Sequence, residues 1–348
     1  MMAAFAYNRV PQAAGEVPER TSMPSGTYIL VFATALLMGL RYEVGGDWFP
    51  YLQNYNMVQL LNYGQALDTF DSGYVTLVFV AGRLNAGIWL VNLVCGLIMT
   101  FGIVRFCSRQ PNPALSFLVA IPYLIIVVGM GYTRQGVAIG LILAGLVHAD
   151  GRSTRKLIFY VLAAALFHRA SLLVLPIVLA PLFRRNLLYA IGAALAFVIL
   201  FALLLARSAD TYITNYVDAE YESGGAVVRV AMNLLPALFA LIWRKRLGFG
   251  SYQSEVWTVF ALIALATFPL VLAASFTTAI DRFALFLIPL QIAVLPRIPY
   301  IFGKQKALNA QLVLAVCAYS AAVQLVWLVF ATHAKYWVPY KSIIFGAQ

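Results

Sequence analysis

Charged and aromatic residues of this sequence stand at the edges of long apolar segments, in patterns that suit sugar and phosphate chemistry. The segment GLRYEVGGDWFPYLQNY places a carboxylate, Asp47, beside the aromatic rings of Trp48 and Tyr51. Aromatic rings pack against the apolar faces of sugars, and a positioned carboxylate takes a proton from an attacking hydroxyl group. The alternative is an interfacial role for the aromatic residues, with Arg41 extending to lipid headgroups. The segment is therefore a candidate sugar-binding and catalytic loop.

Two further segments also place positively charged residues at the edges of apolar stretches. GYTRQGVA contains Tyr132, Arg134 and Gln135 between two apolar stretches. An Arg side chain there can hold a phosphate or carboxylate through two hydrogen bonds, and the following helix offers its N-terminal amides to the same anion. Extension of Arg134 to headgroups is the alternative. LFHRAS has His168 and Arg169 between two short apolar stretches, and ionisable groups at that depth usually face a cavity.

The last two cations of this kind are Arg229 and Arg282. Arg229 begins an apolar stretch after the acidic loop YVDAEYESGG, and Arg282 in TTAIDRF follows Asp281, which could simply neutralise it. A diphosphate held at the outer leaflet of a membrane would need a cluster of such cations. The arginines that the predicted topology places at one depth are Arg41, Arg134, Arg169, Arg229 and Arg282.

The elements that position these residues follow from composition. Hydrophobic residues make up 62% of the 348 positions and charged residues only 11%, against roughly a quarter charged in a soluble domain. An all-α fold is expected, a polytopic helical membrane protein with about eleven transmembrane helices and one re-entrant or interfacial helix at 74–85. The predicted crossings are 28–40, 88–105, 114–130, 136–149, 157–167, 171–183, 187–205, 226–243, 256–274, 283–296 and 308–330.

The distribution of charge sets the expected topology. The net charge is +11, but the basic residues stand in short clusters between apolar segments, so no nucleic-acid partner is expected. We expect a cytoplasmic N-terminal tail (1–25), a membrane domain (26–331) and an outward-facing C-terminal tail (332–348), and we interpret the cytoplasmic clusters as orientation signals. The cytoplasmic basic residues are then Arg105, Arg109, Arg152, Arg155, Lys156, Arg184, Arg185, Arg244, Lys245, Arg246, Arg297, Lys304 and Lys306.

Motifs of several enzyme classes are missing from the sequence. It has no glycine-rich phosphate loop with its Lys, no HExxH motif and no GxSxG motif. These absences disfavour an ATP-driven pump and a nucleotide-sugar enzyme. We predict neither a metal site nor a cofactor.

The order and spacing of five segments resemble a known family. GLRYEVGGDWFPYLQNY, DSGYVTL, YTRQGVAIGLILAG, LFHRASLLVLP and DRFALFLIPL follow one another as in the EpsG-type branch of the Wzy-like polysaccharide polymerases, over roughly 40–290. Gly46 and Trp48 stand where many relatives have other small or aromatic residues, so acceptor recognition is expected to be particular to this chain. The motif positions that carry over are Arg41, Gly45, Asp47, Tyr51, Arg134, Gln135, His168 and Arg282.

The resemblance implies a glycosyltransferase of the bacterial inner membrane. Such an enzyme transfers a glycan chain from undecaprenyl diphosphate to a hydroxyl of another lipid-linked repeat unit, outside the cytoplasmic leaflet. Its expected partners are the lipid-linked oligosaccharide, membrane lipids and other polysaccharide assembly proteins. The arrangement also resembles the C-type membrane glycosyltransferases, in which an acidic residue of the first outer loop serves catalysis, and Asp47 occupies that place.

The expected mechanism is metal-independent and inverting. Arg134 and Arg282, assisted by Arg41 or Arg169, would stabilise the charge on the leaving diphosphate, and Asp47 would activate the acceptor hydroxyl, with His168 as the alternative base. Two other functions remain open from sequence. One is a flippase or transporter of a lipid-linked oligosaccharide, and the other is an O-antigen-type ligase.

Overall fold

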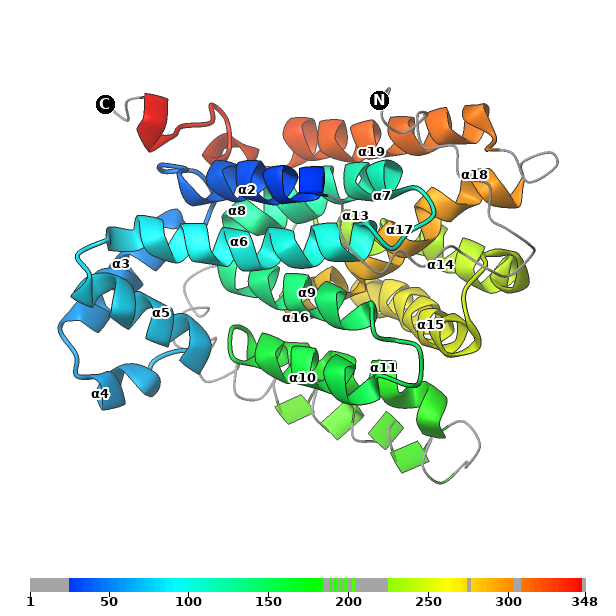
Figure 1. Ribbon diagram of the computed structural model, residues 1–348, viewed down its shortest axis with the longest axis horizontal. Coiled ribbons are helices and arrows are strands. Elements are labelled where there is room, and N and C mark those ends of the chain that lie inside the picture. The colour runs from blue at the N-terminus through cyan, green and yellow to red at the C-terminus, as the bar shows by residue number, and fades with distance from the viewer. Residues whose placement is uncertain are drawn as a thin grey trace.

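The protein is a bundle of helices that run in similar directions across the molecule (Figure 1). The computed structural model describes residues 25–183, 225–273, 277–302 and 308–345, and ten positions between 188 and 203. Within these ranges all regular structure is helical, apart from an isolated antiparallel bridge between Arg41 and Ser342. The expected all-α fold is confirmed.

Most of the helices are short, and several join end to end. Those in the first described range are α2 (Ser25–Gly39), α3 (Trp48–Gln59), α4 (Tyr63–Leu67), α5 (Ser72–Arg83), α6 (Gly87–Cys107), α7 (Pro113–Ala120), the π-helix η1 (Ile121–Val128), α8 (Gly129–Gly131), α9 (Thr133–Leu146), α10 (Thr154–Ala165), the 3-10 helix η2 (Arg169–Leu173) and α11 (Val174–Phe183). Those in the later ranges are α13 (Ala226–Ala231), α14 (Leu234–Ile242), η3 (Arg244–Arg246), α15 (Ser251–Ala273), α16 (Thr277–Ala284), η4 (Leu285–Leu287), α17 (Ile288–Val294), η5 (Leu295–Arg297), α18 (Ile298–Ile301), α19 (Ala310–Phe330), η7 (Ala334–Tyr336) and η8 (Ile343–Phe345).

Five helical stretches of the described residues are long and apolar enough to cross a membrane. They are Gly87–Cys107, Pro113–Gly131, Ser251–Ala273, Thr277–Ile301 and Ala310–Phe330. Shorter apolar helices cover Gly26–Gly39, Thr133–Leu146, Arg169–Phe183 and Ala226–Ile242. These stretches overlap predicted crossings, so the multi-pass helical character is confirmed, and the count of about eleven crossings stays a prediction. Nine of the nineteen positions of the predicted crossing 187–205 lie outside the described residues, and this crossing stays a prediction.

Local sequence explains where two of the long stretches begin. Asn112 precedes α7, and its side-chain oxygen accepts a hydrogen bond from the backbone N–H of Leu115 (3.0 Å), with Pro113 in the first turn. Asn309 caps α19 in the same way, through the N–H groups of Gln311 and Leu312. Both caps satisfy amides that the first helical turn leaves without partners. The polar residues between the apolar segments therefore mark the starts of these helices.

Helices α6 and α9 approach each other closely because small residues lie between them. A Cβ atom added at Gly140 of α9 would lie 2.6 Å from the Cα atom of Met99 in α6, and one added at Gly102 would collide with the backbone of Gly140. Small residues at the contact let helix backbones pack tightly within a membrane. This packing holds the N-terminal turn of α9, where Arg134 lies, at a fixed position against α6 (Figure 1).

Helices α3, α4 and α5 gather at one end of the bundle, beside the start of α6 (Figure 1). We call this end the Asp47 end, after the residue that precedes α3. Helix α5 covers most of the segment 74–85, so a helix there is confirmed, while its re-entrant or interfacial placement stays a prediction.

The C-terminal tail returns to the Asp47 end. The backbone N–H of Gly45 donates to the carbonyl of Tyr336 (2.9 Å), and that of Tyr42 donates to the carbonyl of Lys341 (3.0 Å). The tail therefore packs on the loop that follows α2. The division of the chain at 25/26 and 331/332 stays a prediction.

Candidate functional site

Gly45 fixes the path of the loop that carries Asp47. Its φ angle is +103°, and an added Cβ atom would collide with the backbone oxygen of Met130. Only glycine combines this conformation with so close an approach. The loop consequently lies against the end of the Pro113–Gly131 stretch, and Asp47 follows two residues later.

Asp47 is half-buried at the N-terminal end of α3, and its carboxylate caps no helix amide. Burial raises the pKa of Asp47, while the positive charges of Arg282, Arg134 and His333 lower it in part. Burial disfavours the charged carboxylate because a low-dielectric environment replaces water. Asp47 thus lies within the electrostatic reach of two of the predicted diphosphate-binding arginines.

Asp71 joins two of these arginines directly. It precedes α5, its side chain is buried, and its two oxygens accept from different cations. Oδ2 lies 3.2 Å from Nη1 of Arg134, and Oδ1 lies 3.1 Å from Nε of Arg169. The backbone N–H of Arg169 also donates to Oδ1 (3.3 Å). Asp71 was not among the predicted site residues, although it stands in the motif DSGYVTL.

Arg134 lies at the start of α9 among aromatic side chains. Its guanidinium carbon is 5.6 Å from the ring centre of Phe70 and 5.8 Å from that of Tyr74. Its backbone N–H donates to the hydroxyl oxygen of Tyr51 at 3.5 Å, and Tyr51 in turn packs against Tyr74. The predicted substrate-binding residue Tyr51 is therefore buried beneath Arg134.

Gln135 and Tyr132 connect the same turn to α16. The side-chain amide of Gln135 donates to the backbone carbonyl of Arg282 (2.6 Å). The guanidinium of Arg282 lies over the ring of Tyr132, 5.3 Å from its centre. Both contacts place Arg282 beside the N-terminal end of α9, although 147 residues separate it from Gln135. The Oε1 atom of Gln135 is buried without a hydrogen-bond donor among the described residues.

His168 lies between α10 and η2, and its ring stacks on that of Phe286 with centroids 5.9 Å apart. Burial, together with the positive charges of Arg134, Arg282 and Arg169, lowers the pKa of His168 to about 3. The imidazole is therefore neutral near pH 7. The same pair of arginines, Arg134 and Arg282, acts on both Asp47 and His168.

Arg41 and Trp48 are enclosed within the structure. Arg41 is 1% exposed, and its guanidinium donates to the carbonyls of Met38 and Val44, to Asn92 (3.3 Å) and to Thr133 (2.9 Å). Trp48 is buried in an aromatic cluster with Tyr42 and Trp89. These contacts tie the end of α2 to α6 and α9.

Arg229 pairs with Asp281. Its Nε and Nη2 atoms lie 2.5 and 2.7 Å from the two carboxylate oxygens, which is a bidentate geometry. The carboxylate that the sequence offered as a partner for its neighbour Arg282 thus forms an ion pair with Arg229. Within the described ranges, no group of three His, Cys, Asp or Glu side chains could hold a metal ion.

The predicted residues therefore divide into two groups. The residues of one group interact with one another at the Asp47 end, through contacts or through their charges. They are Asp47, Arg134, Gln135, Tyr132, His168, Arg169 and Arg282. The other group, Arg41, Trp48, Tyr51 and Arg229, is occupied by contacts within the protein.

Comparison with known proteins gives one match. The model of the EpsG family matches residues 27–342, which is nearly the whole chain and includes every residue of both groups. No curated protein and no solved structure is similar enough to be matched to it. The chain therefore belongs to the EpsG family, a family of Wzy-like polysaccharide polymerases.

Proposed function

We propose that this protein is a polysaccharide polymerase of the bacterial inner membrane. It transfers a glycan chain from polyprenyl diphosphate to a hydroxyl of another lipid-linked repeat unit, with the Asp47 end and the C-terminus facing outward and the N-terminus in the cytoplasm. The observation that carries the proposal is the meeting of Arg134 and Arg282 at the N-terminal end of α9, where Gln135 donates to the carbonyl of Arg282 (2.6 Å) and Asp71 pairs with Arg134 (3.2 Å). The charges of both arginines act on Asp47 and His168, so cations and a candidate base from distant parts of the chain come together.

Arg134, Arg169 and Arg282 form the diphosphate-binding set in this proposal. Asp71 holds Arg134 and Arg169, and Arg169 is the more accessible of the two, with a side chain that is 53% exposed against 29% for Arg134. Arginine side chains that are held in place before the reaction stabilise growing negative charge without a cost of reorganisation. Asp71 supplies that order by bridging Arg134 and Arg169. Arg41, which is 1% exposed, and Arg229, whose guanidinium is bidentate to Asp281, are assigned to structure.

Asp47 is the better of the two bases. A general base works best when its pKa lies near the working pH, and burial moves the pKa of Asp47 upward, toward that range. The pKa of His168 moves the other way, to about 3, which makes its imidazole a weak proton acceptor. We therefore assign proton removal to Asp47 and contact with the neutral sugar or diphosphate to His168.

The reaction is a single displacement at the anomeric carbon. The acceptor hydroxyl oxygen bonds to C1 of the donor sugar and passes its proton to the carboxylate of Asp47. The bond between C1 and the diphosphate oxygen breaks, and the electron pair leaves on the diphosphate. Arg134 and Arg282 stabilise this developing charge in place of a divalent cation, and the configuration at C1 inverts.

A reconstituted polymerisation assay tests the proposal. Purified protein receives the lipid-linked repeat unit, and product length is followed by gel electrophoresis. Asp47→Asn and Arg134→Ala should each lower elongation by about a hundredfold, corresponding to roughly 3 kcal/mol of lost transition-state stabilisation. Glu43→Gln, which removes an exposed ion pair with Lys341 (3.0 Å) at the same end, is the control.

The outcomes separate the alternatives. Near-normal chain formation by both site variants would remove this site assignment. Translocation of the lipid-linked unit without lengthening would indicate a flippase, and transfer only to a different acceptor would indicate a ligase.

A further inference from the structure

A cavity of about 430 Å³ lies at the other ends of α9 and α10, away from Asp47. It is lined by Arg105 at the end of α6, His148 after α9, and Arg155, Lys156, Phe159 and Tyr160 in the first turns of α10. Its volume is in the range of small-molecule sites. No step of the proposed transfer uses these residues, so the cavity has a separate role.

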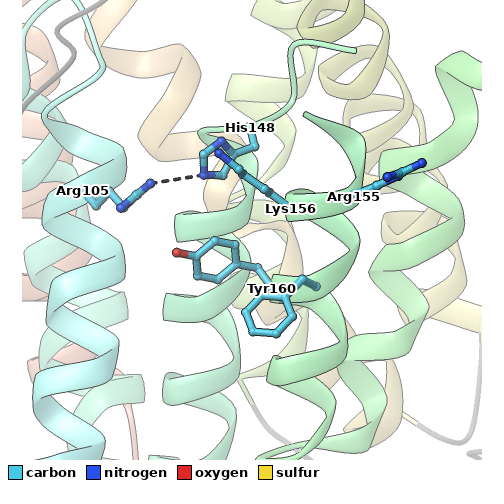
Figure 2. A pocket seen from close by; sticks show the side chains of 6 residues that line it. Arg105, His148, Arg155, Lys156 and Tyr160 are labelled. Carbon is cyan, nitrogen blue, oxygen red and sulfur yellow. Dashed lines mark hydrogen bonds between the residues drawn. The ribbon is translucent and has the colours of Figure 1, made fainter. Parts of the chain in front are cut away.

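The polar side chains of the cavity are ordered by one another. Nη2 of Arg105 lies 3.2 Å from Nε2 of His148, and the imidazole stacks on Tyr160 with an interplanar angle of 16°. Figure 2 shows Lys156 reaching toward His148, while Arg155 points to the opposite side, away from His148. The Nε atom of Arg105 is buried and has no acceptor within the part of the chain that the structure describes. The ammonium group of Lys156, an exposed residue, is the donor that a ligand in the cavity can reach.

Among the described residues, no carboxylate forms an ion pair with the basic residues of this cavity, Arg105, Arg155 and Lys156. Lys156 lies in the first turn of α10, where the helix dipole is positive and where no acidic residue is present. The nearby carboxylate of Asp150 accepts instead from the backbone N–H groups of Arg152 (2.8 Å) and Ser153 (2.7 Å). Burial lowers the pKa of His148, and Arg105 and Lys156 lower it further. An anion is the ligand that this arrangement favours.

The surroundings indicate that the anion belongs to a lipid. Phe159, Leu162 and Leu166 are 66%, 48% and 49% exposed. Their spacing of three and four residues places them on one face of α10, leading away from the cavity. An exposed apolar face on a helix of a multi-pass membrane protein contacts acyl chains.

We propose that the cavity binds the phosphate of an anionic phospholipid headgroup, with the acyl chains lying along Phe159, Leu162 and Leu166. Arg105 and Lys156 contact the phosphate, and His148 holds Arg105 in place. This assignment goes beyond an orientation signal, because orientation requires charge on one side of the membrane and no particular geometry.

Titration of the purified full-length chain with lipid, followed by native mass spectrometry, tests the proposal. The probes are phosphatidylglycerol, zwitterionic phosphatidylcholine and soluble glycerol 3-phosphate. Phosphatidylglycerol should bind more tightly than phosphatidylcholine. Its affinity should fall about fivefold in K156Q and about twenty-five-fold in R105Q/K156Q, since each basic residue near an anionic headgroup contributes roughly a factor of five.

The matched controls are K245Q and K245Q/R246Q, which remove exposed basic residues of η3. They belong to the same predicted side of the membrane, and both should bind phosphatidylglycerol like the unmodified chain. Equal binding of the two phospholipids, or equal losses in the control variants, would overturn the proposal. Competition by glycerol 3-phosphate at the concentration of the lipid would do so as well, because it would indicate a soluble anion. Lys156 is exposed, so K156Q supplies the test even where R105Q/K156Q does not fold.

Discussion

Replacing Asp71 with Asn should slow chain elongation about tenfold, and the loss should vanish in a chain that already lacks the guanidinium groups of Arg134 and Arg169. Asp71 is proposed to act only by holding Arg134 and Arg169, through contacts of 3.2 and 3.1 Å. The Asn side chain keeps the shape of Asp71 but removes the negative charge. Arg134 then keeps its own charge and loses its orientation.

The magnitude follows from the exposure of the pair. The side chain of Asp71 is 5% exposed and that of Arg134 is 29% exposed, so water screens their attraction only in part. A hydrogen bond between charged groups contributes about 1.5 to 3 kcal/mol, and we take the lower value because Arg134 is partly solvated. Since about 1.4 kcal/mol corresponds to a factor of ten in rate, D71N should lose about tenfold. R134Q, which removes the stabilising cation itself, should lose about a hundredfold.

The assay compares initial elongation rates of five proteins at saturating donor, namely the unmodified chain, D71N, R134Q, R134Q/R169Q and D71N/R134Q/R169Q. If Asp71 acts only through the two arginines, the triple variant should be about as slow as R134Q/R169Q. Glu43→Gln should change the rate less than about twofold, since it breaks an exposed pair at the same end. Thermal unfolding in detergent identifies variants whose loss comes from unfolding.

A further tenfold loss in D71N/R134Q/R169Q relative to R134Q/R169Q would refute the reasoning. Asp71 would then affect elongation independently of both arginines, and its role as a positioning residue would be wrong.

Two other predictions concern the base and the packing that supports the site. The value of kcat/KM should fall as the pH is lowered through the pKa of Asp47, because the base works only when it is deprotonated. Burial raises this pKa above its usual value. A fall that begins only near pH 3 would implicate His168 instead. Gly140→Ala should lower the melting temperature, with a cost of about 2 kcal/mol from overpacking against Met99. Gly26→Ala is the control and should not lower the melting temperature, because an added Cβ atom there meets no atom within 4 Å. Equal melting temperatures of the two variants would contradict the close α6–α9 contact.

The positions of the helices could be predicted from sequence because apolar stretches are long and polar residues interrupt them. The crossing predicted at 88–105 is α6 (Gly87–Cys107), and that predicted at 114–130 is the stretch Pro113–Gly131. The same pattern indicated the arginines proposed for the site, since each one borders an apolar stretch, and their role stays a prediction. Arg134 lies at the start of α9, and Arg282 lies in the last turn of α16.

The pairing of charges could not be predicted, because neighbours in sequence point in different directions on a helix. Asp281 and Arg282 are adjacent in α16, yet successive helical side chains diverge, and the carboxylate meets Arg229 instead. The ion pairs of Asp71 span 63 and 98 residues, a separation that local pattern cannot resolve. Arg41 could have been assigned to structure, since it follows the end of α2, where unpaired carbonyls such as that of Met38 attract cations.

The charge balance of the proposed site explains how it could both hold and release its lipid diphosphate. Asp71 pairs with Arg134 and Arg169, and the charges of Arg134 and Arg282 act on Asp47. The three guanidinium groups and two carboxylates together leave only a small net positive charge to attract the donor. When Asp47 takes the proton of the acceptor, one negative charge disappears from the site as negative charge grows on the diphosphate. The attraction therefore increases during bond breaking, which is where binding energy accelerates a reaction. Once Asp47 loses that proton, the attraction decreases again and the carrier lipid can leave before the next transfer.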